Sequence, residues 1–154
     1  MTATDSPDTF TEVRPDSDDP VLGLLAGIAT QEIRDLRYQV LPRNYGLLVR
    51  YEGRVSDIAT AEEWFHALDT ELTGRRVSQI LWDSRPAKAH PPEVRKRIWE
   101  WLEEARVLKR SAILVDSEML RLSANLSAVG GKVRIRAFHD FAEAEGWLRA
   151  DPDA

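Results

Sequence analysis

The stretch Leu47-Leu48-Val49-Arg50-Tyr51-Glu52-Gly53 is an apolar run that ends in a glycine, and an amphipathic helical pattern follows it from about Ile58. Residues 77–82, 112–115 and 133–137 are three further apolar runs, each followed by a small polar cluster and a helical pattern. This repetition is typical of βα units around a mostly parallel sheet. The functional edge of such a sheet is formed by the carboxyl ends of its strands. The sequence therefore predicts an α/β fold and directs attention to the residues that follow each strand.

The beginning of the sheet has a different pattern. Residues 36–40 alternate between apolar and polar side chains, and Pro42-Arg43-Asn44 predicts a turn into the run at 47–51. Two such runs joined by a short turn indicate an antiparallel hairpin. Together with the three later strands, the hairpin gives a mixed five-stranded sheet.

About four main helices accompany these strands. Apolar residues recur at helical spacing over 58–72, 94–108, 119–129 and 141–148. Ser117 and Asp140 are the expected N-caps of the last two helices. Asp19-Pro20 has the pattern of an N-cap and a first-turn proline, so the sequence also predicts a short extra helix after it.

The net charge of -5 comes from the first twenty residues. This segment has six acidic residues and one arginine, and the rest of the chain is balanced. It is rich in Asp, Ser, Thr and Pro, so it cannot bury enough apolar surface to offset the entropy lost on ordering. We expect residues 1–20 to be a disordered acidic tail. Residues 21–154 are expected to form a single domain, as the chain length favours.

The composition excludes several classes of protein. The chain has no cysteine, which excludes disulfides, thiolate catalysis and Cys-based metal sites. Its longest apolar stretch, residues 21–29, is far shorter than the ~20 residues of a spanning helix, so we expect a cytoplasmic protein without a membrane span. Basic residues are concentrated in 85–136, but no stacked aromatic residues or recognised binding motif accompany them. Nucleic acid is therefore not an expected partner.

The sequence shows no convincing catalytic set. There is no Gly-x-Ser-x-Gly elbow, and the three histidines do not suggest a triad, since His66 is expected on the solvent side of its helix. Asp57, Asp83 and Asp116 follow neighbouring strands and could gather around Mg²⁺. An aspartate at a strand end more often caps the following helix. We therefore expect no enzymatic activity, no cofactor and no metal, with the three aspartates as the weaker alternative.

The longest connection between a strand and a helix is residues 83–92, Asp-Ser-Arg-Pro-Ala-Lys-Ala-His-Pro-Pro. Long loops at this edge of a sheet are commonly functional. The loop could grip an anion or offer Ser84 for phosphorylation, and the alternative is a rigid solvated connection. We expect a partner-binding surface that combines the loop with the exposed side of the next helix. Its residues are Ser84, Arg85, Lys88, His90, Arg95 and Trp99.

Trp99 is included because of its position on that helix. It lies about 120° from the centre of the apolar stripe, at 100° per residue. Arg and Trp are the residue types most often found as binding anchors. The alternative is that the ring of Trp99 lies against the aliphatic stems of Arg95 and Lys96.

These patterns together resemble the SpoIIAA-like superfamily, which includes STAS (sulfate transporter and anti-sigma factor antagonist) domains and bacterial single-domain relatives. The resemblance covers about residues 37–150 and rests on 47–56, 80–85 and Arg136-Ala137-Phe138-His139-Asp140 with the helix that follows. It implies a SpoIIAA-like fold and a non-enzymatic role, because STAS anti-sigma factor antagonists bind partner kinases or signalling proteins. They are switched by phosphorylation of a serine before the second helix. Ser84 falls near the equivalent turn, with Arg85-Pro86 following it.

Two functional hypotheses follow. The first is a protein-binding or regulatory module with a protein partner. The second is a carrier of a small lipophilic ligand, because relatives of similar fold bind such ligands and the five tryptophans could line a cavity.

Overall fold

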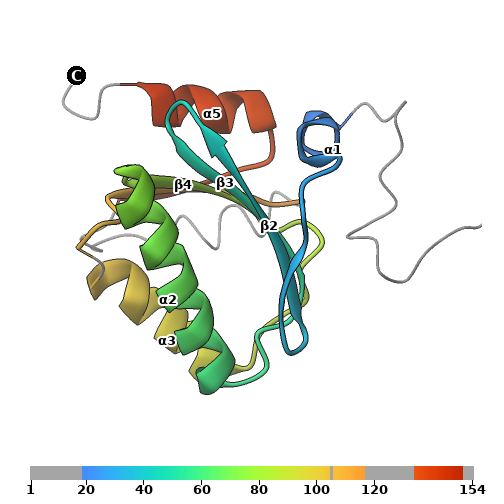
Figure 1. Cartoon of the computed structure of the whole chain (residues 1–154), viewed down its shortest axis with the longest axis vertical. Coiled ribbons are helices and arrows are strands. Elements are labelled where there is room, and N and C mark those ends of the chain that lie inside the picture. The colour runs from blue at the N-terminus through green and yellow to red at the C-terminus, as the bar shows by residue number, and fades with distance from the viewer. Residues whose placement is uncertain (1–18, 105, 117–133, 151–154) are drawn as a thin grey trace, which may run out of the picture.

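A computed structural model of the chain describes residues 19–104, 106–116 and 134–150 (Figure 1). Its sheet has six strands in the order β1-β2-β3-β4-β5-β6. The strands are β1 (Gln31–Ile33), β2 (Leu36–Arg43), β3 (Gly46–Gly53), β4 (Gln79–Asp83), β5 (Arg110–Leu114) and β6 (Arg134–Phe138). The pairs β1–β2 and β2–β3 are antiparallel, and the remaining three pairs are parallel. The mixed α/β fold is thus confirmed. The sheet has one strand more than the sequence predicts, because three residues are too few for β1 to show an alternating pattern.

The described helices cover both faces of the sheet. They are α1 (Pro20–Leu25), α2 (Ile58–Arg75), α3 (Pro92–Glu104) and α5 (Phe141–Arg149). Figure 1 shows α2 and α3 on one face and α1 and α5 on the other. None of the described helices is long and apolar enough to cross a membrane.

Residues 1–18 and 117–133 lie outside the described residues, as do the tail and the helix predicted there. Disorder of residues 1–18 therefore stays a prediction, whereas the last two residues of the predicted tail are ordered in the structure. Asp19 and Pro20 are the N-cap and first residue of α1, and the Asp19 carboxylate accepts a hydrogen bond from the Val21 N–H at 3.0 Å.

The apolar run that begins at Leu47 supplies both cores because β3 is covered on both faces. Leu47 and Val49 pack with α2 and α3, whereas Leu48 packs on the opposite side with α1 and α5. All three side chains are fully buried. A strand buried on both faces reads as a continuous apolar run, which is the pattern at 47–49.

The C-terminal end of α5 is held by side chains from the sheet. The last carbonyl groups of a helix have no partner within the helix. Here Arg110 donates hydrogen bonds to the carbonyl oxygens of Trp147 and Ala150, at 2.8 and 3.0 Å, and Gln79 donates to that of Leu148 at 2.9 Å. The helix is therefore fixed to β4 and β5 at this end.

A buried carboxylate fixes the same helix to the β2–β3 hairpin. Glu145 of α5 accepts hydrogen bonds from Arg43, at 2.8 and 3.0 Å, and from the Tyr45 hydroxyl at 2.8 Å. Burial by itself would raise the pKa of Glu145, but the hydrogen bonds from Arg43 and Tyr45 hold it below its usual value. Burial, followed by the hydrogen bond to Glu145, raises the pKa of Tyr45 strongly.

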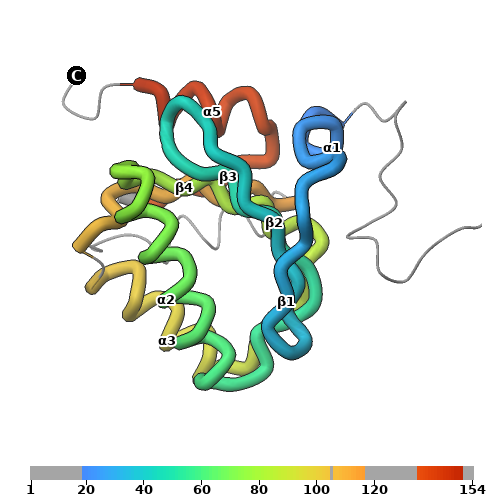
Figure 2. Tube along the Cα trace, in the orientation of Figure 1, coloured from blue at the N-terminus to red at the C-terminus, as the bar shows by residue number. Residues whose placement is uncertain are grey.

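The carboxyl ends of β3 and β4 lie next to each other and lead into α2 and α3. Figure 2 shows the two connecting segments running together at the end of the molecule where both helices begin. Asp57 caps α2, since its carboxylate accepts a hydrogen bond from the Thr60 N–H at 2.8 Å. This edge of the sheet holds most of the residues that the sequence nominates for function.

Candidate partner-binding surface

The loop of residues 84–91 is hydrogen-bonded to the main chain on both sides. The Ser84 N–H donates to the Leu114 carbonyl at 3.1 Å, and the Ala87 N–H closes a turn onto Ser84. The Lys88 N–H donates to the Gly53 carbonyl at 2.8 Å, and Ala87 forms an isolated bridge with Gly53. The loop is therefore held along the end of β3. This agrees with the alternative given in the sequence analysis, that the loop is a rigid connection.

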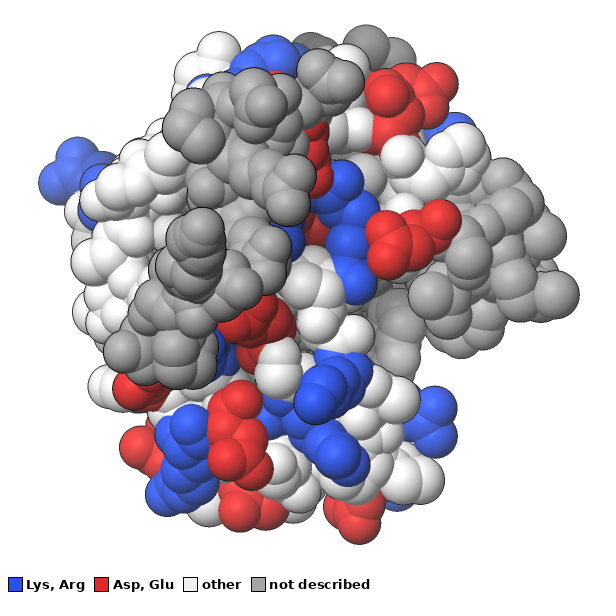
Figure 3. Space-filling view, turned by 90° about the vertical axis from the view of Figure 1, so that its right-hand side faces the viewer, with Lys and Arg blue, Asp and Glu red and all other residues white. Residues whose placement is uncertain are grey.

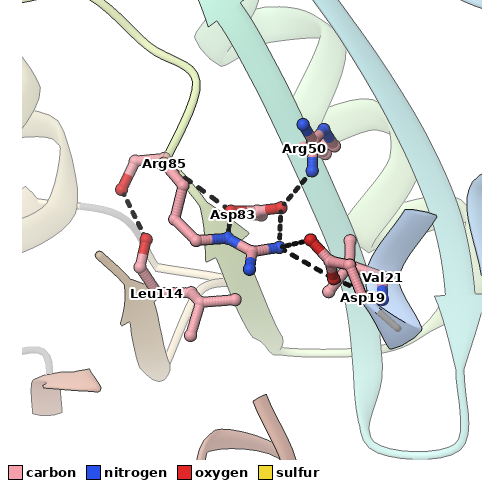
Figure 4. Close-up of polar contacts among 7 residues, drawn as sticks. Asp19, Val21, Arg50, Asp83, Arg85 and Leu114 are labelled. Carbon is pink, nitrogen blue, oxygen red and sulfur yellow. Dashed lines mark hydrogen bonds and ion pairs between the residues drawn. The ribbon is translucent and has the colours of Figure 1, made fainter. Parts of the chain in front are cut away.

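Arg85 is part of an ion-pair network beneath this surface (Figure 4). Its guanidinium contacts both carboxylate oxygens of Asp83, at 2.8 and 2.9 Å, and reaches Asp19 at 2.9 Å. Asp83 is fully buried and also pairs with Arg50 at 2.8 Å. The hydrogen bonds to Asp83 raise the pKa of Arg85, whereas burial lowers the pKa of Arg50. Two arginines and two aspartates thus neutralise each other. These ion pairs indicate a structural role for Arg85, and its contact with a partner stays a prediction.

The hydroxyl of Ser84 is also engaged. It donates to the Leu114 carbonyl at 3.0 Å, and a second hydrogen bond joins Ser84 to Tyr51. Burial raises the pKa of Tyr51 to about 12, although the bond to Ser84 works in the other direction. Phosphorylation of Ser84 stays a prediction, and the modification would have to break the bond to Leu114.

His90 connects the loop to the segment between β3 and α2. Its Nδ1 accepts a hydrogen bond from the Val55 N–H at 3.2 Å, and its ring stacks on Tyr51 with centroids 6.2 Å apart. Burial lowers the pKa of His90, and the charges of Arg54 and Arg95 lower it further. The neutral imidazole is therefore favoured, as an acceptor at Nδ1 requires.

The charges of Arg54 and Arg95 act on His90, and Lys88 lies two residues before it in the loop. We call these three exposed cations, Arg54, Lys88 and Arg95, the basic patch. Within the described part of the chain none of the three has an ion pair. Figure 3 shows Lys and Arg side chains gathered below the centre of this face of the molecule. The structure places Arg95 near His90, and Lys88 lies in the same loop as His90. Their role as partner contacts stays a prediction. Arg54 also belongs to the basic patch, although the sequence analysis does not nominate it. Its position directly after Gly53, at the carboxyl end of β3, is the signal that could have identified it.

Trp99 is not an exposed ring. It is partly buried and packs against the large core cluster between the sheet and the helices α2 and α3. The expectation of a solvent-facing aromatic anchor is therefore not met at this position. The 100° periodicity predicts only the direction of a side chain, and a ring as large as that of tryptophan reaches the core from the side of the stripe.

The three aspartates considered as a magnesium site do not form one cluster of free carboxylates. Asp57 caps α2, Asp83 is paired with two arginines, and Asp116 is exposed. Among residues 19–104, 106–116 and 134–150 no group of three or more His, Cys, Asp or Glu side chains could hold a metal ion.

Three of the five tryptophans line a cavity, as the carrier hypothesis expects. Trp64, Trp82 and Trp101 surround it together with Tyr51, Phe65, Ile98, Leu102 and Ile113. Its volume is about 60 Å³, whereas pockets for small organic ligands usually measure roughly 300–1,000 Å³. A groove of about 530 Å³ lies between β2 and α2, but no tryptophan lines it. The tryptophan-lined cavity therefore does not support a lipid carrier.

No family model matches the sequence, and a search of curated proteins gives no match either. Solved structures do match. One is an uncharacterised protein of the DUF3478 family with a SpoIIAA-like fold from Shewanella loihica PV-4, with a TM-score of 0.57 and 14% identity over 78% of this chain and 98% of that chain. The fold is SpoIIAA-like. A second match is an anti-sigma factor antagonist from Mycobacterium paratuberculosis, with a TM-score of 0.53 and 12% identity over 78% of this chain and 100% of that chain. The SpoIIAA-like fold predicted from the sequence is thus confirmed.

Proposed function

We propose that this chain is a non-enzymatic regulatory module that binds an acidic surface of a protein partner through the basic patch. The observation that carries the proposal is the set of three exposed cations without ion pairs in the described part of the chain. The similarity to an anti-sigma factor antagonist supports a role of this kind. The cytoplasmic location expected from the sequence belongs to the same proposal.

The arrangement of the patch favours binding over catalysis. Lys88 and Arg54 are placed by the backbone bond between the Lys88 N–H and the Gly53 carbonyl, and the Val55 N–H donates to Nδ1 of His90. A cationic surface on a rigid base can steer an acidic partner and fix its register. The buried acids and bases nearby are already paired with each other, so they are not poised for proton transfer to a substrate.

The test is capture of partners from the native cell by the full chain and two variants. The first variant carries Arg54→Glu, Lys88→Glu and Arg95→Glu. The control is Lys109→Glu, which reverses an exposed cation directly before β5. We expect a defined protein to be captured by the wild type and by the control but not by the triple variant. Equal capture by all three proteins would contradict the proposal.

Folding of the triple variant must be established separately. Because the three side chains are exposed and have no ion pairs in the described residues, their reversal should change the free energy of unfolding by only about 0.5 kcal/mol per site. Urea denaturation of the three proteins checks this. A captured partner should also dissociate as the salt concentration rises, since exposed charges are screened.

Ser84 offers a means of regulating the same surface. A phosphate there would add a charge of about -1.5 to -2 four residues before Lys88. We propose that it weakens binding of an acidic partner. Ser84→Asp should reduce capture more than Ser84→Asn, which has a similar size but no charge. Equal reduction by both variants would mean that only the bond to Leu114 matters.

A further inference from the structure

The acidic N-terminal segment is tied to the domain beside the basic patch. Residues 1–18 contain five acidic residues and one arginine. The described domain begins with Asp19, whose carboxylate is bound by Arg85 at 2.9 Å. We propose that residues 1–18 dock on the basic patch of their own chain and compete there with an acidic partner, an inference whose competitive part rests on the proposed function.

The attachment point places the segment within reach of the patch. Arg85 precedes Lys88 by three residues in the loop 84–91, so the main chain between them spans at most about 11 Å. The eighteen residues before Asp19 could extend to roughly 60 Å. This reach is about five times the largest main-chain span between Arg85 and Lys88. The segment is therefore long enough for its acidic residues to lie over the patch.

Charge complementarity and the attachment point together favour this surface. The three cations of the patch have no ion pair in the described part of the chain, whereas Arg34, Arg43 and Arg97 are each paired with a glutamate. Other exposed cations, such as Lys109, also have no ion pair among the described residues. The patch differs from them because Lys88 lies in the same loop as Arg85, which binds Asp19. The contact between Asp19 and Arg85 already joins this acidic end of the chain to the loop.

The tether determines how strong the competition can be. A short covalent linkage gives an effective concentration of about 1 mM. If the isolated segment bound with a dissociation constant near that value, it would occupy the patch about half of the time, and a competing ligand would bind roughly twofold more weakly. The tethered segment thus weakens every ligand that competes for the patch by the same factor, whatever the affinity of that ligand.

The docking is tested in the full chain without a partner. Because the sequence has no cysteine, Ser6→Cys provides a single site for a nitroxide spin label. We expect paramagnetic broadening of the backbone amide signals of residues 53–55, 87–90 and 93–95. The broadening should disappear when Arg54, Lys88 and Arg95 are replaced by Glu and at about 0.5 M salt, and persist in Lys109→Glu. Absence of selective broadening, or broadening that the triple variant retains, would overturn the docking.

The competition is tested with a decaglutamate peptide as the acidic probe. In the comparison variant the five acidic residues of the segment are neutralised as Asp5→Asn, Asp8→Asn, Glu12→Gln, Asp16→Asn and Asp18→Asn. We expect this variant to bind the probe at least about twofold more tightly than the wild type at low salt. Equal affinity would refute the competition. If the probe bound neither protein, the proposed function would fail, and the spin-label experiment would still decide whether the segment docks.

Discussion

The hydroxyl of Tyr45 donates a 2.8 Å hydrogen bond to the carboxylate of Glu145, which lies 100 residues later in the chain. The bond joins the β2–β3 turn to the last helix, and both side chains are more than nine-tenths buried. A hydrogen bond to an ionised carboxylate is stronger than a hydrogen bond between two neutral groups.

Tyr45→Phe removes this donor and keeps the ring. We expect the free energy of unfolding to fall by about 1.5–3 kcal/mol, because a hydrogen bond to a charged group is lost in a buried place. Urea denaturation followed by circular dichroism measures the change. Arg75→Ala is the control, since it breaks an exposed pair with Glu71 and should cost less than about 0.5 kcal/mol. Equal effects of the two changes would mean that the bond to Glu145 has no special strength.

Arg85 and Lys88 should behave differently although both are loop cations. Arg85→Ala leaves the buried Asp83 carboxylate with Arg50 as its one ion-pair partner, beside the main-chain N–H of residue 85. It also removes the ion pair with Asp19, so we expect a loss of at least about 2 kcal/mol of stability. Lys88→Ala should change stability by less than about 0.5 kcal/mol. Thermal and urea unfolding compare the two variants. A stable Arg85→Ala protein would restore Arg85 as a candidate contact residue.

His90 should make stability depend on pH in the acidic range. Its pKa is lower in the folded protein than in the unfolded chain, so the unfolded state binds the extra proton. The free energy of unfolding should therefore fall as the pH drops past the unfolded pKa of about 6.5, and level off below the folded value. His90→Gln, which can still accept from Val55, should show a smaller drop between pH 7.5 and pH 5. The control His66→Gln alters an exposed side chain and should keep the wild-type drop.

Two glycines offer a matched test of backbone strain. Gly46 has φ of +155°, and a Cβ there would collide with the Gln79 carbonyl oxygen, whereas a Cβ on Gly23 in α1 would meet nothing within 4 Å. We expect Gly46→Ala to cost about 2 kcal/mol or more. Gly23→Ala should stabilise the protein by up to about 1 kcal/mol. The midpoints of urea unfolding measure both changes. If Gly46→Ala left the free energy of unfolding unchanged, the β2–β3 turn would be able to move away from β4.

Trp99→Ala should reveal a packing role. The ring packs against the core cluster, so its removal should lower the free energy of unfolding by about 1–3 kcal/mol. Ile58→Ala truncates a side chain that is 39% exposed and should cost less than about 1 kcal/mol. If Trp99→Ala left stability unchanged but abolished partner capture, the ring would be an anchor after all.

The parts of the fold that the sequence predicts are those with a local signal. The strand at 47–51 is a continuous apolar run, and the helix from Ile58 has apolar residues at helical spacing. Asp140 caps α5, as its spacing with Glu143 indicates. β1 has no such signal, because it is three residues long and two of them are exposed. Its position depends on pairing with β2, which no local pattern records.

The candidate surface was predicted in part for the same reason. Lys88, His90 and Arg95 are close in the sequence, so the loop and the next helix brought them together. The ion pairs of Arg85 could not be predicted from local sequence, because one of its partners, Asp19, is 66 residues away. Glu145 has the i,i+4 spacing with Arg149 that is typical of a solvated pair, and only the tertiary structure gives it Tyr45 and Arg43.

The bonds from Arg110 and Gln79 to the end of α5 also impose an order on events in the cell. During synthesis the hairpin and β4 are made long before residues 141–150 exist, so the apolar face that α5 covers waits for the last part of the domain to be translated. Contacts between residues so far apart slow folding and leave the surface open to aggregation in the meantime. A ribosome that stalls just before Phe141 would therefore present a chain whose sheet lacks part of its covering, a species that a chaperone could recognise.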